Sequence, residues 1–311
     1  SRALDHVGVL ARSLEDLALV TECIAGFAED DADTLPPRAR PPLSAVLAQE
    51  PPLPPKLALV RTPFWDRLDA DARATFDELA QALGDRADAV ELPPEIAGAV
   101  DWHRTVFEAD LAANFEPEYE RGADRLSASL RGQIERGRRV PAIDYLRALA
   151  RISPARAGFD ELLGGYDAIV TPATLGTAPK GLDSTGDPLP ATLWTYCGMP
   201  ALSLPLARGE NGLPLGVQLV GRYGDDARLL RTARWLCAIV AGTAAFKAEA
   251  ESDPRVAAAL RWLLSPAGVS LRVPVLELML ARLRRWSSAH RRELLECCRR
   301  AIEQDGRLES A

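Results

Sequence analysis

Five short apolar runs, each closely followed or ended by proline or glycine, constrain this chain more than any other feature of its sequence. They fall at residues 56–61, 89–92, 166–172, 201–206 and 215–220. Runs of this length suit strands that are largely buried. Stretches with apolar residues at helical spacing lie between them. This alternation predicts an α/β fold with a mixed β-sheet flanked by helices.

Helix start and stop signals frame the longer segments between these runs. Ser13 can cap a first helix, residues 69–83 predict a second that ends at Gly84, and residues 225–242 predict a third. Residues 98–163 predict mostly helix. The expected breaks there are Pro117, Gly122, Gly137–Pro141 and Pro154.

Strand, helix and strand over residues 56–92 predict a βαβ unit, and residues 201–220 predict an antiparallel hairpin. Pro205 marks an edge or irregular position in that hairpin. The proline-rich residues 30–55 predict a surface connection without regular structure. Strand signals disappear after residue 242, so we expect a boundary near residue 243 and an α-helical extension over 243–311.

Composition excludes several classes of protein. Hydrophobic residues make up 47% and charged residues 26% of the chain, enough for a sizeable core. A net charge of −7 argues against a general nucleic-acid-binding surface. No apolar run approaches the roughly 20 residues of a membrane span. The five cysteines lack metal-ligand spacing, so we expect buried free thiols, a cytoplasmic protein and no cofactor or metal.

Four blocks then match one family in the right order. They are 4–13 (LDHVGVLARS), 166–172 (YDAIVTP), 194–205 (WTYCGMPALSLP) and 212–221 (GLPLGVQLVG). Together they resemble the segments that follow the catalytic core in amidase-signature enzymes. The resemblance covers residues 1–242 and implies the C-terminal portion of an amidase domain. It implies a mixed sheet with helices and chemistry on amide groups. The tail, 254–306, resembles a helical stretch of amidases similar to fatty acid amide hydrolases.

The resemblance also implies that the catalytic machinery is missing. The family's nucleophile lies in a Gly-Gly-Ser-Ser-Gly-Gly stretch, and a second serine relays its proton to a lysine, because a serine hydroxyl needs a base to become a nucleophile. That stretch precedes the block at 4–13, so the opening at Ser1 predicts a start that is not natural. The adjacent pair Ser287-Ser288 has no glycine beside it. The lysines are Lys56, Lys180 and Lys247, none of them in a matching context. We therefore expect no catalytic residue in this chain.

Substrate-binding candidates come from the blocks that, by resemblance, line the cleft opposite the missing serines. They are Thr171, Pro172, Trp194, Tyr196, Gly198 and Met199. Packing in the core and loops is the alternative interpretation. On a strand, Trp194 and Tyr196 would share a face, because alternate residues of a strand point the same way.

Other chemically suggestive residues have simpler interpretations. Lys180 with Ser184 predicts a solvated loop, and Cys197 a packed thiol. The acidic residues Asp30, Asp31 and Asp33 lack the glycine and glutamate of a calcium loop and predict a solvated turn. His103 is predicted to lie on a helix surface. The cluster Arg136–Arg139 is too short to overturn the acidic balance.

The sequence therefore predicts an amidase half that acts on a small-molecule amide and is inactive alone. Its expected partner is the missing N-terminal half or a second copy of the chain, because a truncated sheet leaves strand edges and apolar surface uncovered. Two alternatives stay open. One is a non-catalytic assembly partner of a full amidase. The other is an amidotransferase A-type subunit, which would need a glutaminase partner and a tRNA-facing site.

Overall fold

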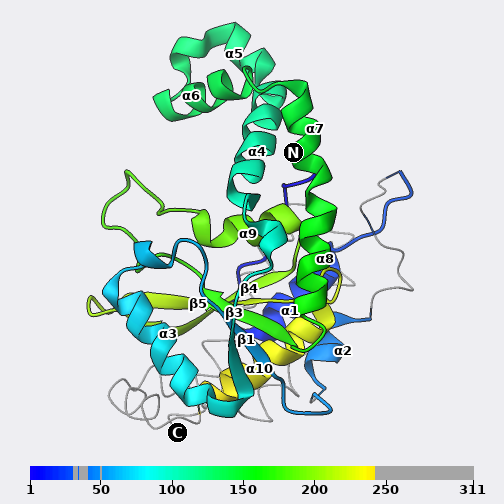
Figure 1. Ribbon diagram of the computed structural model, residues 1–311, viewed down its shortest axis with the longest axis vertical. Helices are drawn as coiled ribbons and strands as arrows, with labels where there is room; N and C mark the ends of the chain where they lie inside the picture. The colour runs from blue at the N-terminus through cyan, green and yellow to red at the C-terminus, as the bar shows by residue number, and fades with distance from the viewer. Residues whose placement is uncertain (31–33, 35–40, 50, 242–311) are drawn as a thin grey trace, which may run out of the picture. The chain divides into compact units, whose positions relative to one another are not determined.

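The computed structural model describes residues 1–30, 34, 41–49 and 51–241, within a compact unit that spans Ser1–Thr243. A five-stranded sheet in the order β2-β1-β3-β5-β4 forms its centre (Figure 1). The strands are β1 (Leu57–Val60), β2 (Ala87–Val90), β3 (Ala168–Pro172), β4 (Ala201–Arg208) and β5 (Pro214–Val220). The predicted mixed sheet is confirmed. The predicted extension over 243–311 lies outside the described residues.

The first half of the sheet is parallel. Strands β2 and β3 both run parallel to β1, and helix α3 (Ala70–Leu83) connects β1 to β2. The side chain of Asp69 caps α3, and Gly84 ends it with φ of 51°. The predicted βαβ unit is therefore confirmed. Strand β2 begins two residues earlier than expected because it pairs in register with β1 and ends opposite Val60.

The second half of the sheet is antiparallel. Strand β5 pairs with β3 on one side and β4 on the other, so the predicted hairpin is confirmed. Its turn contains Gly212 with φ of 75°, a conformation that favours glycine. Strand β4 lies at the sheet edge, and its register shifts between Leu204 and Ala207, around Pro205. Proline lacks the N–H that a regular ladder needs, which explains this position.

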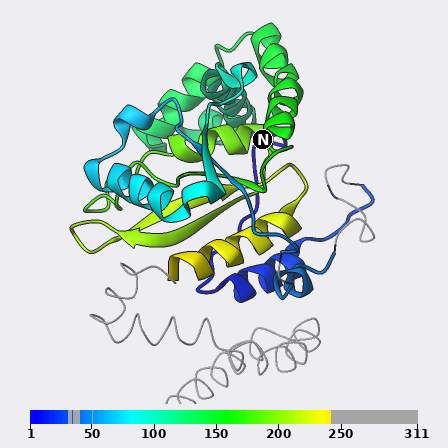
Figure 2. The ribbon, with the colours of Figure 1, turned by 60° about the horizontal axis from the view of Figure 1, so that its bottom comes forward.

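One helical layer consists of α10 (Asp226–Ala241), α1 (Leu14–Ile24) and α2 (Leu43–Leu47). Helix α10 packs on β4 and β5, and the two short helices pack against it (Figure 2). Ser13 caps α1 as expected, with its Oγ accepting a hydrogen bond from Asp16 N at 3.1 Å. Helix α2 corrects the prediction that 30–55 lacks regular structure. Its Leu47 is buried against α1 and α10, so packing favours one helical turn there.

The other layer is mostly helical, as predicted for residues 98–163. It contains α4 (Ala99–Asn114), α5 (Glu116–Gly122), α6 (Ala128–Gly137), α7 (Ala142–Ala150), α8 (Ile152–Leu162) and, later in the chain, α9 (Leu189–Cys197). Short 3-10 turns are at Trp65–Arg67, Gly84–Arg86, Pro94–Ile96 and Ala123–Arg125. The main core joins Val60, Ile169 and Val220 of the sheet to side chains of α4, α7, α8 and α9. No helix in the described part of the chain has the length and apolarity to cross a membrane.

Candidate functional site

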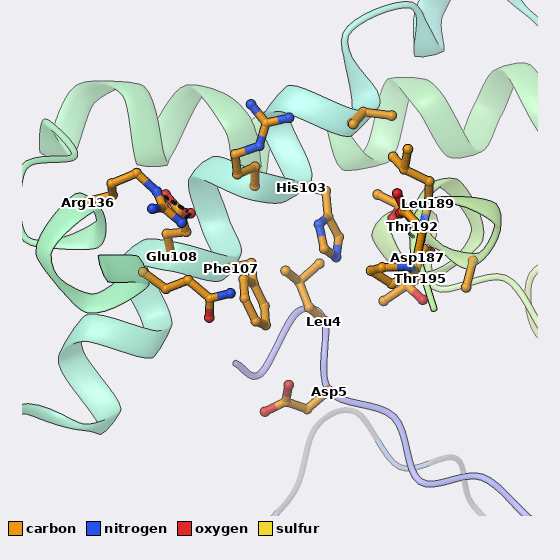
Figure 3. Close-up of a pocket in the computed structure, with 15 residues that line it drawn as sticks. Leu4, Asp5, His103, Phe107, Glu108, Arg136, Asp187, Leu189, Thr192 and Thr195 are labelled. Carbon is orange, nitrogen blue, oxygen red and sulfur yellow. Dashed lines mark hydrogen bonds and ion pairs between the residues drawn. The ribbon is translucent and has the colours of Figure 1, made fainter. Parts of the chain in front are cut away.

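A cavity of about 700 Å³ lies beside α4 and α9. Four segments far apart in sequence line it: Leu4 and Asp5, one side of α4, one turn of α6, and residues 187–195. Figure 3 shows Leu4 with the α4 side chains His103 and Phe107 on one side and the α9 side chains on the other. Apolar atoms make up most of the wall, with a few polar groups, as in typical small-molecule sites.

Helix α9 forms one wall of this cavity. Proline residues sit at its start, and Gly198 ends it in the left-handed conformation with φ of 64°. Because a helix turns every 3.6 residues, Thr192 and Thr195 share a face, which lines the cavity. Asp187 holds the turn before the helix. Its Oδ1 accepts a hydrogen bond from Leu189 N at 3.0 Å.

An ion pair joins α4 to α6 at the cavity wall. Both Nε and Nη2 of Arg136 donate to Oε1 of Glu108, at 2.8 Å and 2.6 Å. Among the residues that the structure describes, Glu108 is the one buried side chain that carries a formal charge. Charged side chains are rarely buried without a partner. The hydrogen bond to Glu108 raises the pKa of Arg136, so the guanidinium stays charged.

His103 lies on α4, as predicted, but it is half-buried and lines the cavity, which corrects the expected surface position. Its ring stacks on Phe107 with centroids 5.9 Å apart. Burial lowers the pKa of His103, and the positive charge of Arg104 lowers it further. Since the ordinary pKa of histidine is already near 6.5, the ring is neutral at pH 7.

The six predicted substrate-binding residues lie in the core or against it. Trp194 packs on Phe159 with ring centroids 5.3 Å apart, and Tyr196 donates its hydroxyl proton to the carbonyl of Ala148. The other four are buried Thr171 and Pro172 at the end of β3, Gly198 at the C-cap of α9, and buried Met199. None of them lines the described cavity. Their role in binding substrate stays a prediction.

The local structure around Trp194 differs from the expectation of a strand. Residues 189–197 form α9, and on a helix two side chains two positions apart point about 200° from each other. Both rings are nevertheless buried, on different sides of the helix turn. Of the cavity-facing residues of α9, Thr195 lies in the family block at 194–205, and Thr192 lies outside it, where helical periodicity was the available signal.

The candidate serine and lysine residues lie as the simpler interpretations predict. Lys180 and Ser184 are both exposed, and Ser184 Oγ accepts a hydrogen bond from Gly186 N at 3.1 Å. Lys56 pairs instead with Asp88, with Nζ 2.6 Å from a carboxylate oxygen. Lys247, Ser287 and Ser288 lie outside the described residues. The serine–lysine machinery is therefore not assembled by the part of the chain that the structure describes.

The three thiols in the described part of the chain are free, as predicted, but not uniformly buried. Cys197 is buried, Cys237 is partly buried, and Cys23 is exposed on α1, which corrects the expectation for Cys23. Burial raises the pKa of Cys197 to about 12, a poor setting for a nucleophilic thiolate. Asp30 is exposed, while Asp31 and Asp33 lie outside the described residues. Within residues 1–30, 34, 41–49 and 51–241, no three His, Cys, Asp or Glu side chains form a cluster that could hold a metal ion.

The chain is similar to known proteins over most of its length. The family model for Amidase matches residues 1–230. The chain belongs to the amidase family. A 2-amino-5-chloromuconic acid deaminase of Comamonas testosteroni is 26% identical over 257 residues, covering 77% of this chain and 52% of the relative. The A-type subunit of the glutamyl-tRNA(Gln) amidotransferase of Picosynechococcus sp. is 28% identical, covering 74% and 55%.

Solved structures of this family share the fold. One is described as an unexpected vestigial protein complex that reveals the evolutionary origins of an s-triazine catabolic enzyme. It matches with a TM-score of 0.66 and 25% identity, over 75% of this chain and 53% of the other. The amidase-family chain thus spans about half the length of the relatives it matches. The resemblance read from the four sequence blocks is confirmed.

Proposed function

We propose that this chain supplies the substrate-facing part of an amidase that hydrolyses the C–N bond of a small carboxylic amide. The observation that carries the proposal is the mostly apolar cavity between α4, α6 and α9, which lies inside the region matched by the family model. Small-molecule sites have this character, with few polar groups in an apolar wall.

The nucleophile, in this proposal, comes from a segment outside the chain. Hydrolysis of an amide needs an activated hydroxyl and a base within hydrogen-bond reach of it. Lys56 is held by Asp88 and Lys180 is exposed, so neither offers a buried base. We expect the chain alone to be inactive.

The proposed docking edge for the missing half is β4. Ala201, Ser203 and Pro205 alternate as exposed positions along this edge strand. An edge strand offers unpaired backbone groups to another strand, and relatives about twice as long could supply one. A second copy of this chain is the alternative occupant of the edge.

In this proposal, the six residues predicted to bind substrate support the substrate-facing wall. They are Thr171, Pro172, Trp194, Tyr196, Gly198 and Met199. Thr171 Oγ1 and Trp194 Nε1 are buried and have no hydrogen-bond partner among the described residues. Free thiols favour a cytoplasmic location.

Reconstitution tests the proposal. The chain would be co-expressed with the N-terminal half of a related amidase, which carries the Gly-Gly-Ser-Ser-Gly-Gly segment, and ammonia release from a panel of small amides would be measured. We expect activity only from the combined halves. Activity of the isolated chain, or a stable complex that is inactive on every amide, would contradict it.

A second candidate function is that of an amidotransferase A-type subunit. The match to the corresponding subunits of glutamyl-tRNA(Gln) amidotransferases favours it. The net charge of −7 weighs against a tRNA-facing surface on this chain. Gel-shift titration with tRNA separates the two, because the small-amide hydrolase predicts no shift at physiological salt.

A further inference from the structure

We propose that Glu108 sets the charge selectivity of the cavity by neutralising Arg136, so that the site takes amides whose remote end is neutral. This inference rests on the proposed function, because it assumes that the cavity holds the amide. It concerns the remote part of the ligand rather than the bond that is cleaved.

The geometry makes the pair a fixed part of the wall. Two nitrogens of Arg136 converge on one oxygen of Glu108, and both residues line the cavity (Figure 3). Close helix packing keeps the partners together. A β-carbon added at Gly137 would lie 1.8 Å from the carbonyl oxygen of Glu108, so α4 and α6 meet backbone to backbone at this point. The close packing therefore fixes the separation of the two backbones that carry the pair.

The remaining charged groups leave no arginine of the wall without a carboxylate. Arg104 pairs with Asp101 at 3.2 Å, Asp187 is held by Arg67 at 2.5 Å, and Asp5 pairs with the N-terminal amine of Ser1. His103 is neutral at pH 7, for the reasons given above. A ligand carboxylate entering the cavity would meet the carboxylates of Asp5, Glu108 and Asp187, while each cation nearby already has a carboxylate partner. Like charges nearby disfavour binding, so an anionic amide is selected against.

Three ligands of similar length test this: hexanamide, adipic acid monoamide and 6-aminohexanamide, whose remote ends are neutral, anionic and cationic. Their Kd values for the full 311-residue chain would be measured by ligand-observed NMR. We expect hexanamide to bind at least about fivefold tighter than the monoamide, the size of effect typical of a partly exposed ion pair.

The variant Glu108→Gln keeps an acceptor for Arg136 and removes the negative charge. We expect it to tighten binding of the anionic monoamide about fivefold while hexanamide changes little. The control is Glu135→Gln on α6, whose carboxylate accepts from the Tyr119 hydroxyl at 3.2 Å and does not line the cavity. It should leave all three affinities unchanged.

A reciprocal variant keeps the test decisive if Glu108→Gln does not fold. Arg136→Gln leaves the Glu108 carboxylate without its cation, so 6-aminohexanamide should bind about fivefold tighter than to the unmodified chain. Unchanged ligand ratios in a folded variant would overturn this inference and leave the cavity proposal standing. Failure of every amide to bind the unmodified chain would overturn the proposed function and this inference with it.

Discussion

The side chains of α9 meet two kinds of surroundings. Leu193, Trp194 and Tyr196 are at most 1% exposed and pack into the main core. Thr192 and Thr195, on the same nine-residue helix, line the cavity. The difference teaches that the aromatic residues of the family block pack α9 into the core, while its two small polar residues line the cavity in which we propose that a ligand binds. Substitutions of the core-packed residues and of the cavity-lining residues can separate these roles.

The largest effect is expected at Trp194. Replacing this buried ring with alanine removes its contact with Phe159 and leaves a cavity, which typically costs about 3–5 kcal/mol. Thr195→Ala is the control from the cavity side and should cost less than about 1 kcal/mol. Urea unfolding measures both. Equal losses in the free energy of unfolding for the two variants would remove the distinction between core-packed and cavity-lining residues of α9.

The contact between α4 and α6 supports the cavity from the other wall. A β-carbon at Gly137 would clash with the Glu108 carbonyl, so Gly137→Ala should destabilise the fold by about 1–3 kcal/mol. Gly132 on the same helix has only an Arg136 nitrogen at 3.6 Å from that position. Gly132→Ala should therefore stabilise by about 0.5–1 kcal/mol. We expect the two substitutions to change the free energy of unfolding in opposite directions. Shifts of the same sign would argue against the close contact.

Tyr196→Phe tests another core-packed residue of α9 and should give a smaller change in the free energy of unfolding. The hydroxyl donates to the Ala148 carbonyl, and that oxygen also accepts from Arg151 N at 3.2 Å. The carbonyl thus keeps a partner, and the variant should lose about 1 kcal/mol or less in the free energy of unfolding. A loss as large as that of Trp194→Ala would mean that the hydrogen bond, rather than the ring, holds the helix.

Cys197 should show the smallest effect below pH 9, because its thiol is protonated there in both the folded and the unfolded chain. Burial raises its pKa from 9.0 to about 12. The folded chain therefore holds this proton between those values while the unfolded chain releases it, so stability is lost as pH rises from 9 towards 12. At pH 8, iodoacetamide should modify exposed Cys23 and spare Cys197, as peptide mass spectrometry would show. Equal modification of both thiols in the folded chain would contradict their different burial.

Much of the fold could be predicted because its signals are local. Asp69 and Gly84 frame α3 as cap and stop, and Pro205 marks the irregular edge strand. The short helix α2 was missed because the prolines around Leu43–Leu47 mask an apolar turn that is stabilised by packing on α10. Local propensity is a weak guide where tertiary contacts decide.

The cavity could not be predicted because its parts are distant in sequence. Leu4, His103, Arg136 and Thr195 come from four segments, and neither His103 nor Arg136 lies in a recognisable motif. The family block at 194–205 indicated α9. The residues singled out there, Trp194 and Tyr196, are buried in the core of the protein. His103 was expected on a surface because sequence gives no sign of Leu4 or α9 nearby.

The account's central claim is that this chain contributes the cavity wall and not the nucleophile. Intact-mass spectrometry after treatment of the reconstituted halves with a fluorophosphonate probe tests it most directly. We predict one adduct on a serine of the N-terminal half and an unchanged mass for this chain. An adduct on any serine of this chain would contradict the claim.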